Sequence, residues 1–361
     1  MVRRRLLATG ATLSMVALGG CSDTATITAP ALVPDVLAPV GSVNATDYKP
    51  PMALTPALLH TQSQGFDNNG AGLSVGVSYT IDPFVDGIAT IWNPSGVPTP
   101  ISVGGGAPAV AYGINSFDEV VGVTIPFGPR AGFFRQSGGN VTVLFGPPGT
   151  TQLEARDVND QHVVVGGLVG PGGQQHAFRY SVATGYGDLH PAGPWVASHA
   201  EAINVTGTIV GWASLPNGER HAARWSSAGV FQDLGLLPAG GTFAEPMDIN
   251  TPGAIGGQGG NAAAGIPFLW RQASGYTTNP TANSAINGVS DLMRLTGYTP
   301  FNGVRRAWTK FGGGPTTLLP NPAGFNSGEA NAVTICGSVT GSSRTAGGFT
   351  RATYWERTSC D

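Results

Sequence analysis

The stretch "HAEAINVTGTIVGW" (residues 199–212) has the pattern of a β-strand, a tight turn and a second β-strand. Its "NVTG" (204–207) places Asn first and Gly fourth, which are type I turn preferences, and the Asn side chain can bond the nearby backbone. Similar stretches recur as "EARDVNDQHVVVGG" at 154–167 and "AEPMDINTPGAIGG" at 244–257. The sequence therefore contains a repeated unit that begins with two strands joined by a turn.

This unit occurs seven times along the chain. Its turn position is occupied by Asn69, Asn115, Asn159, Asn204, Asn250, Ser290 and Thr334, at intervals of 40 to 46 residues. A glycine follows seven residues after each of these positions, and a second block, seen as "HAARW" at 221–225, keeps the same period. Two independent registers with one period indicate a true internal repeat.

The copy that begins near residue 200 shows what one unit forms. Strands are expected at 200–204, 208–214, 221–226 and 230–237, joined by a turn, a loop and a second turn. A four-stranded antiparallel meander of about 45 residues is the blade of a β-propeller. We therefore predict an all-β fold, a seven-bladed β-propeller over residues 51–361. Trp225, at the end of the third strand, is interpreted as packing between blades rather than as a platform for a sugar.

The seventh copy ends soon after Trp355, too early for a fourth strand. In the third copy, Leu189 of the fourth strand precedes the next turn residue, Asn204, by 15 positions, and Leu54 precedes Asn69 by the same distance. We therefore predict that the segment around Leu54 supplies the missing strand of the last blade. This pairing would cover an edge that is otherwise exposed.

The motifs "AINVTGTIVG" (202–211), "HAARW" (221–225) and "DLGLLPAGG" (233–241) resemble the HAF family of bacterial extracellular repeats. The units of that family carry A-x-x-I-N-x-x-G-x-V-V-G, H-A-F-x-W and D-L-G-x-L-P-G-G in this order. The resemblance covers about residues 52–361 and implies an extracellular repeat protein. It assigns no catalytic residues.

The first twenty residues have the features of a lipoprotein signal peptide. "MVRRRLL" is positively charged, and the apolar core from Leu6 to Leu18 is too short to span a membrane. The ending "ALGGC" (17–21) resembles the bacterial lipobox, which implies that Cys21 becomes the lipidated first residue. Ser22 then implies sorting to the outer membrane. The alternative is an ordinary secretory signal followed by a chance cysteine.

Residues 21–50 are rich in Thr, Ala and Pro, which is typical of a flexible tether. We expect a protein held to the membrane by its lipid, in the cell envelope and exposed to the periplasm or the cell surface.

Composition excludes one class of partner. Residues 1–20 contain Arg3, Arg4 and Arg5 and no acid, so their removal changes the net charge from −3 to −6. No basic groove for nucleic acid is therefore expected. We also expect a monomer without a cofactor.

Cys336 and Cys360 are the cysteines that remain after Cys21. In an oxidising envelope such a pair predicts a disulfide, and no clustered histidines accompany it to suggest a metal site. His176 and His221 occupy the same repeat position, which favours a structural role. Asp157 and Asp248, two residues before the turn position, are interpreted as hydrogen-bonding near the turn rather than binding calcium.

One further position combines acids and a histidine. Five residues before the turn position lie Gln64, Val110, Glu154, His199, Glu245, Ala285 and Glu329. If the first strands are innermost, these residues surround one mouth of the central channel, on the face that carries the longer loops. Glu154, His199, Glu245 and Glu329 are therefore the candidate ligand-binding residues, for a cation or a hydroxyl-rich ligand, or for acid–base chemistry. The alternative is solvated loop charges.

Three functions remain open at this point. The first is a lipid-anchored binding or interaction module for an envelope glycan or a protein. The second is a glycan-active hydrolase or lyase, which rests on analogy of fold alone. The third is a purely structural surface protein.

Overall fold

The computed structural model describes residues 47–125, 129–261 and 264–360, and its regular elements are β-strands. Repeats 1 to 6 each form four antiparallel strands, and an N-terminal strand completes the three strands of repeat 7, as predicted. Repeats 1 to 3 comprise β2 (Gln62–Asn68), β3 (Ser74–Tyr79), β4 (Ile88–Trp92) and β5 (Pro98–Pro100); β6 (Ala109–Ile114), β7 (Val120–Thr124), β8 (Ala131–Arg135) and β9 (Val141–Leu144); and β10 (Gln152–Val158), β11 (Val164–Val169), β12 (Gln175–Ser181) and β13 (Gly185–Asp188).

Repeats 4 and 5 are joined into one larger sheet by a single parallel bridge between Arg220 and Phe243. They comprise β14 (Ala197–Ile203), β15 (Ile209–Ser214), β16 (Arg220–Trp225) and β17 (Phe231–Gly235); and β18 (Phe243–Ile249), β19 (Ile255–Asn261), β20 (Ala264–Arg271) and β21 (Gly275–Thr278). Repeats 6 and 7 comprise β22 (Ala285–Val289), β23 (Arg294–Phe301), β24 (Val304–Phe311) and β25 (Thr317–Leu318); and β26 (Ser327–Val333), β27 (Val339–Arg344), β28 (Thr350–Trp355) and β1 (Met52–Ala53).

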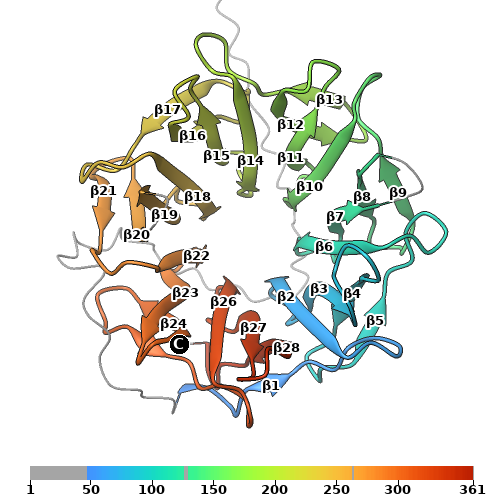
Figure 1. Cartoon of the computed structure of the whole chain (residues 1–361), viewed down its shortest axis with the longest axis vertical. Helices are drawn as coiled ribbons and strands as arrows, with labels where there is room; N and C mark the ends of the chain where they lie inside the picture. The colour runs from blue at the N-terminus through green and yellow to red at the C-terminus, as the bar shows by residue number, and fades with distance from the viewer. Residues whose placement is uncertain (1–46, 126–128, 262–263, 361) are drawn as a thin grey trace, which may run out of the picture. The chain divides into compact units, whose positions relative to one another are not determined.

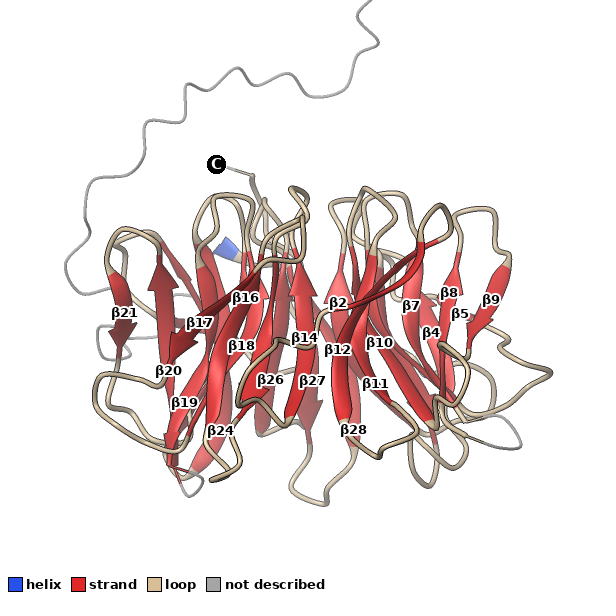
Figure 2. Cartoon of the chain, turned by 90° about the horizontal axis from the view of Figure 1, so that it is seen from above, coloured by secondary structure: helices blue, strands red, loops and turns tan. Residues whose placement is uncertain are grey.

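The first strand of each repeat lies nearest the centre of the molecule (Figure 1). The strands run between two faces, seen at the top and bottom of Figure 2. We name the face with the turn residues, such as Asn204, the turn face. The opposite face, which carries the connections between second and third strands and between repeats, is the loop face.

The turn asparagines recur with the period of the repeat because each one bonds both its own turn and the next repeat. Asn204 Oδ1 accepts hydrogen bonds from the backbone N–H groups of Thr206 and Thr208, at 3.1 and 2.9 Å, and so fixes its own turn. Its Nδ2 donates to the carbonyl of Asn250, the same position of the next repeat, at 2.9 Å. The equivalent donations from Asn69, Asn115, Asn159 and Asn250 span 3.0–3.1 Å. One side chain therefore closes a turn and links two sheets.

The hydrophobic core lies between neighbouring sheets. Val165 and Leu189 of repeat 3 pack with Ile209 and Trp225 of repeat 4. Trp225 is fully buried, and its Nε1 donates to the carbonyl of Leu189 at 2.7 Å. Equivalent bonds join Trp92 to Thr55 and Trp355 to Pro320. The interpretation of these tryptophans as packing between repeats is therefore confirmed.

The N-terminal strand completes the last sheet. Met52 pairs with Tyr354 and Ala53 with Thr353, and the Leu54 N–H donates to the Ala352 carbonyl at 2.7 Å. Leu54 is only 1% exposed. The segment around Leu54 thus supplies the fourth strand, β1, as predicted.

Contacts with the last sheet begin before residue 51. Tyr48 pairs with Arg357 in an isolated bridge, and Lys49 Nζ lies 2.6 Å from the Glu356 carboxylate. The predicted signal peptide, Cys21 and residues 22–46 lie outside the described residues. Within the residues that the structure describes, no helix is both long and apolar enough to span a membrane.

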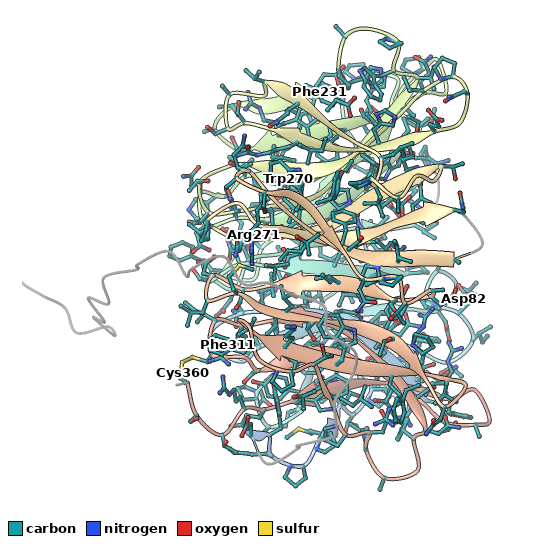
Figure 3. The ribbon with its side chains drawn as sticks, turned by 90° about the vertical axis from the view of Figure 1, so that its left-hand side faces the viewer. Asp82, Phe231, Trp270, Arg271, Phe311 and Cys360 are labelled. Atoms are coloured by element: carbon teal, nitrogen blue, oxygen red, sulfur yellow. A yellow bond between two sulfur atoms is a disulfide. The ribbon has the colours of Figure 1, made fainter. Side chains whose placement is uncertain are left out.

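The predicted disulfide is present. Cys336 and Cys360 are bonded, with their Cα atoms 4.4 Å apart (Figure 3). The bond ties the segment after β28 to the turn that follows β26. It therefore holds the C-terminal end of the chain on the turn face.

Candidate functional site

Every first strand contains a β-bulge at the same position, three residues before the turn residue. In repeat 3, the pairing of β10 with β11 shifts register between Ala155 and Asp157. The inserted residues of the seven repeats are Phe66, Tyr112, Arg156, Glu201, Met247, Asn287 and Asn331. Bulges re-aim side chains and are frequent next to functional sites.

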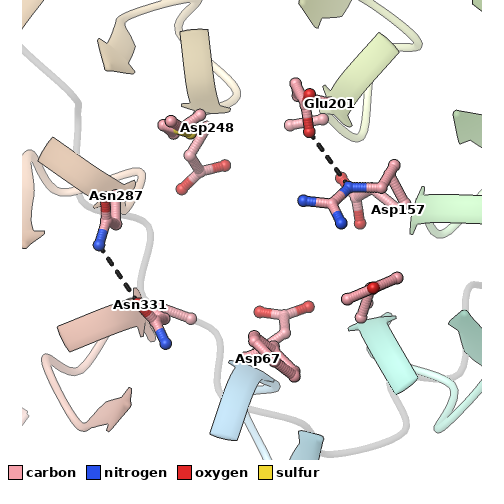
Figure 4. Close-up of a pocket in the computed structure, with 13 residues that line it drawn as sticks. Asp67, Asp157, Glu201, Asp248, Asn287 and Asn331 are labelled. Carbon is pink, nitrogen blue, oxygen red and sulfur yellow. Dashed lines mark hydrogen bonds and ion pairs between the residues drawn. The ribbon is translucent and has the colours of Figure 1, made fainter. Parts of the chain in front are cut away.

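These seven residues line one cavity of about 280 Å³ at the centre of the molecule, which we name the central cavity. Asp67, Asp157 and Asp248, from the position that follows the bulge residue, also line it. Figure 4 shows labelled side chains of six repeats around the same space. At the bulge position the residue type changes from aromatic to basic, acidic, apolar or amide between repeats.

The three aspartates are held by backbone groups. In Asp157, Oδ1 accepts from the N–H of Val158 at 2.7 Å, and Oδ2 accepts from the N–H of Ile203 in the next repeat at 2.8 Å. Asp67 and Asp248 make the equivalent pairs of bonds. The hydrogen-bonding interpretation of Asp157 and Asp248 therefore agrees with the structure, although one bond of each reaches the next repeat.

Burial raises the pKa of all three carboxyl groups, and that of Asp248 reaches about 7. The negative charge of Asp157 adds to the rise at Asp67 and Asp248. The structure pairs none of the three with a cation among its described residues. Burial in the central cavity therefore favours the protonated form of these carboxyl groups over the ionised form, and Asp248 titrates near neutral pH.

A second group of charges lies beside them. Arg156 Nε donates to Glu201 Oε2 at 3.1 Å, and the guanidinium lies 4.3 Å from the centre of the Tyr112 ring. Glu201 Oε1 lies 3.0 Å from His199 Nδ1. Burial disfavours the ionised form of Glu201, but His199 and Arg156 outweigh it and lower the pKa to about 2. Glu201 is therefore a carboxylate at all physiological pH values.

The sequence-predicted glutamates each form an ion pair between repeats. Glu154 pairs with Arg130 at 2.9 Å, Glu245 with Arg220, and Glu329 with Arg305 at 2.7 Å. In each case the arginine lies at the start of the third strand of the preceding repeat. These glutamates lie on first strands, so the alternative of loop charges does not describe them.

Three of the four candidate residues line a common cavity. Glu154, His199 and Glu245 line a space of about 320 Å³, which we name the rim cavity. It shares Arg156, Glu201 and Met247 with the central cavity. Glu329 instead lines a different cavity with Gln64 and Arg305. Val110 and Ala285, at the same repeat position, are buried.

The repeated histidines contact acids of their own repeat. His176 Nδ1 lies 3.1 Å from Asp188, and His221 Nδ1 lies 3.0 Å from Asp233. Each pair joins the start of the third strand to the fourth strand. This contact accounts for the joint occurrence of the "HA" and "DL" motifs and agrees with a structural role.

Comparison with known proteins shows the fold and not the family. No family model matches the chain, and none of the curated proteins matches it. Virginiamycin B lyase from Staphylococcus aureus has a TM-score of 0.57 at 10% identity, over 86% of this chain and 99% of that one. YCF48 bound to D1 peptide has a TM-score of 0.53 at 8% identity, over 89% and 98%. These are β-propeller proteins, and the chain shares their all-β architecture.

The raised pKa of Asp248 predicts a pH dependence of stability. Folded Asp248 holds its proton up to about pH 7, whereas the unfolded residue releases it near pH 3.9, so the folded state binds more protons between these values. The free energy of unfolding should therefore fall as pH rises from about 4 to 7. Because the cavity is open to water, we expect Asp248 to contribute about 1–2 kcal/mol of this decrease.

Chemical denaturation at a series of pH values measures this decrease. The Asp248→Asn variant cannot ionise and should show a smaller decline between pH 4 and 7, whatever its absolute stability. A decline of the same size in the variant would show that Asp248 titrates normally.

Proposed function

We propose that this protein is a lipid-anchored binding module of the bacterial cell envelope, a seven-bladed β-propeller of the HAF-repeat type that holds its ligand in the central cavity. The observation that carries the proposal is the single cavity lined by the seven bulge residues. All seven repeats contribute their bulge residue, which varies in type from repeat to repeat, to the lining of that one space.

The contrast between the recurring structural positions and the varying bulge position supports this proposal. The turn asparagines, the third-strand tryptophans and the His–Asp pairs recur because each repeat needs the same contacts to fold and to pack. The bulge residues share no such contact: Arg156 pairs with Glu201, whereas Asn287 donates to Asn331. The bulge residues are held on rigid strands, which is where a precise binding site is best supported.

We favour binding over glycan hydrolysis or lyase chemistry. A general acid must give a proton to the leaving group. Glu154, Glu245 and Glu329, the carboxylates predicted for acid–base chemistry, each hold an arginine of the preceding repeat in an ion pair. These ion pairs link neighbouring repeats, which favours a structural contribution of the carboxylates over proton transfer.

A pull-down from fractionated cell envelope tests the binding proposal. The wild-type chain should retain a glycan or protein component. Met247→Trp should reduce its retention by at least about tenfold, because Met247 lines both cavities and the larger ring fills them. Glu329→Gln, in a different cavity, is the matched control and should leave retention unchanged. Equal retention by all three chains would place the ligand elsewhere.

Membrane attachment has its own test. Replacing Cys21 with Ser should move the protein from the membrane pellet to the soluble fraction, because the acyl chains on this residue supply the proposed attachment. Fractionation followed by immunoblotting measures the distribution. A Cys21→Ser variant that stays in the membrane pellet would exclude Cys21 as the anchor. We propose that the anchored protein is a monomer in the outer membrane.

A further inference from the structure

His199 on β14 is enclosed between two repeats. It is 3% exposed and stacks on Trp212, with the ring centres 5.7 Å apart and the planes 12° apart. Gly167 on β11 of the preceding repeat leaves room for it, because a Cβ there would lie 2.6 Å from His199 Nε2. The imidazole ring is therefore fixed in place by its surroundings.

The two ring nitrogens face two different carboxylates. Nδ1 lies 3.0 Å from Glu201 Oε1, and Nε2 lies 4.0 Å from Glu154 Oε2. Neither nitrogen makes a well-directed hydrogen bond with any residue that the structure describes. Glu154 Oε1 accepts from Arg130 at 2.9 Å. His199 Nε2 and Glu154 Oε2 are thus separated by a gap too long for a direct hydrogen bond.

One oxygen atom would bridge this distance. An oxygen about 2.8 Å from both atoms would subtend an angle of about 90°, which is compatible with a hydroxyl group that accepts from one and donates to the other. If Nε2 carries a proton, the hydroxyl accepts from it and donates to Glu154. If Nε2 is unprotonated, the hydroxyl donates to Nε2, and Glu154 keeps Arg130. A hydroxyl therefore suits both forms of His199.

Other ligand groups suit the gap less well. An ammonium group cannot accept from a protonated Nε2, and an anion is repelled by Glu154. The rim cavity also presents Gln175 and Arg156, whose side chains carry further hydrogen-bonding groups for neighbouring hydroxyls. Its volume of about 320 Å³ is at the lower end of the range for small-molecule sites, as expected for a single compact ring.

We propose that His199 and Glu154 form a subsite for a hydroxyl group of a sugar residue. This inference rests on the proposed binding function and assigns the ligand class to the rim cavity, which adjoins the central cavity. The subsite lies on the first strands of repeats 3 and 4, between two ion pairs that keep Glu154 and Glu201 in place.

Ligand-observed NMR with the purified full-length protein, in a detergent without a sugar headgroup, tests the subsite. The probes are D-glucose, D-galactose, D-mannose and N-acetyl-D-glucosamine, each with its fully O-methylated form. At least one free sugar should bind, and its methylated form should bind at least about tenfold more weakly because it has no O–H donor. In protein with ¹⁵N-labelled histidine, the sugar should shift the Nε2 signal of His199.

Two variants and a matched control complete the test. His199→Phe keeps the ring on Trp212 but removes both nitrogens, and Glu154→Met keeps the side-chain length but removes the acceptor. Each should weaken sugar binding at least about tenfold. Glu329→Met removes the equivalent glutamate and ion pair in repeat 7 and should leave sugar binding unchanged. If one of the two site variants does not fold, the other is decisive.

The outcomes separate the two proposals. Failure of all four sugars to bind would overturn the subsite and leave a bound water as the occupant of the gap. Sugar binding that both site variants retain would also overturn it. In either case, retention of an envelope component that Met247→Trp loses would still support the proposed function. Absence of sugar binding together with absence of retention would overturn both.

Discussion

The Asn204→Ala variant is expected to lose about 3–5 kcal/mol of the free energy of unfolding. Asn204 is 5% exposed. Its side chain accepts hydrogen bonds from the N–H groups of Thr206 and Thr208 and donates one to the carbonyl of Asn250. Alanine leaves the two N–H groups without their partner, at about 1–3 kcal/mol each, and the Asn250 carbonyl keeps only its bond from the Gly253 N–H. Water relieves part of the loss at the turn. Chemical denaturation of the purified variant beside the wild-type protein measures the difference.

Repeat 6 has a serine at the turn position, which suggests a milder substitution of Asn204 as a control. Ser290 occupies the same position in repeat 6, and its Oγ accepts from the N–H four residues later at 3.1 Å. Asn204→Ser should therefore keep one turn bond and lose the bond to the next repeat, at a cost of about 1–2 kcal/mol. Equal losses for the serine and alanine variants would mean that the turn bond contributes nothing. A loss below about 1 kcal/mol for both would contradict the role of Asn204 as a link between sheets.

These contacts explain why the architecture could be predicted from sequence. A residue that fixes its own turn and also bonds the next repeat must recur at every repeat, so its period is visible in the chain. The leucine near the end of the fourth strand also recurs with the repeat period, because it packs against the following repeat. Leu54 and Leu189 are both buried near a tryptophan of that repeat. The disulfide followed from two cysteines placed at one end of the last repeat.

The central cavity was harder to predict because its seven bulge residues do not recur. Alternation along a strand places Arg156 on the same face as Glu154. The bulge after Ala155 breaks that alternation, so that Asp157 also reaches the cavity. No periodic signal marks an inserted residue. The available signal was the variation itself, Phe, Tyr, Arg, Glu, Met, Asn and Asn at one repeat position.

The ionic partners of the glutamates also escaped prediction. Arg130 and Glu154 are 24 residues apart, on the third strand of one repeat and the first strand of the next. Their contact depends on how neighbouring sheets pack, and the pattern within one repeat does not determine that. The orientation of His199 toward two carboxylates has the same origin, because Glu154 and Glu201 lie in different repeats.

A chain that starts at residue 62 is expected to be at least about 5 kcal/mol less stable than one that starts at residue 47. The truncation removes β1 and exposes the edge of β28. It also removes Leu54 from its contacts with Trp92, Ala352 and Tyr354, which alone is worth about 2–5 kcal/mol for a buried leucine. Finally, Trp92 Nε1 loses the Thr55 carbonyl, at about 1–3 kcal/mol. Thermal and chemical unfolding of the two chains measure the difference.

A third chain and an added peptide show which contacts matter. A chain starting at residue 51 loses Tyr48 and the exposed Lys49–Glu356 ion pair but keeps β1, and it should be only about 1–2 kcal/mol less stable. A synthetic peptide of residues 47–61 should restore stability to the chain starting at residue 62, because it can pair with the free edge of β28. Equal melting temperatures for the chains starting at 47 and 62 would contradict closure by the N-terminal strand. Since β1 pairs with the last repeat and leads directly into the first, its removal takes away one connection between these two repeats. Direct bonds between them, such as that from Asn331 Nδ2 to the Gly65 carbonyl, stay intact, as do the links formed by Asn204 and its equivalents.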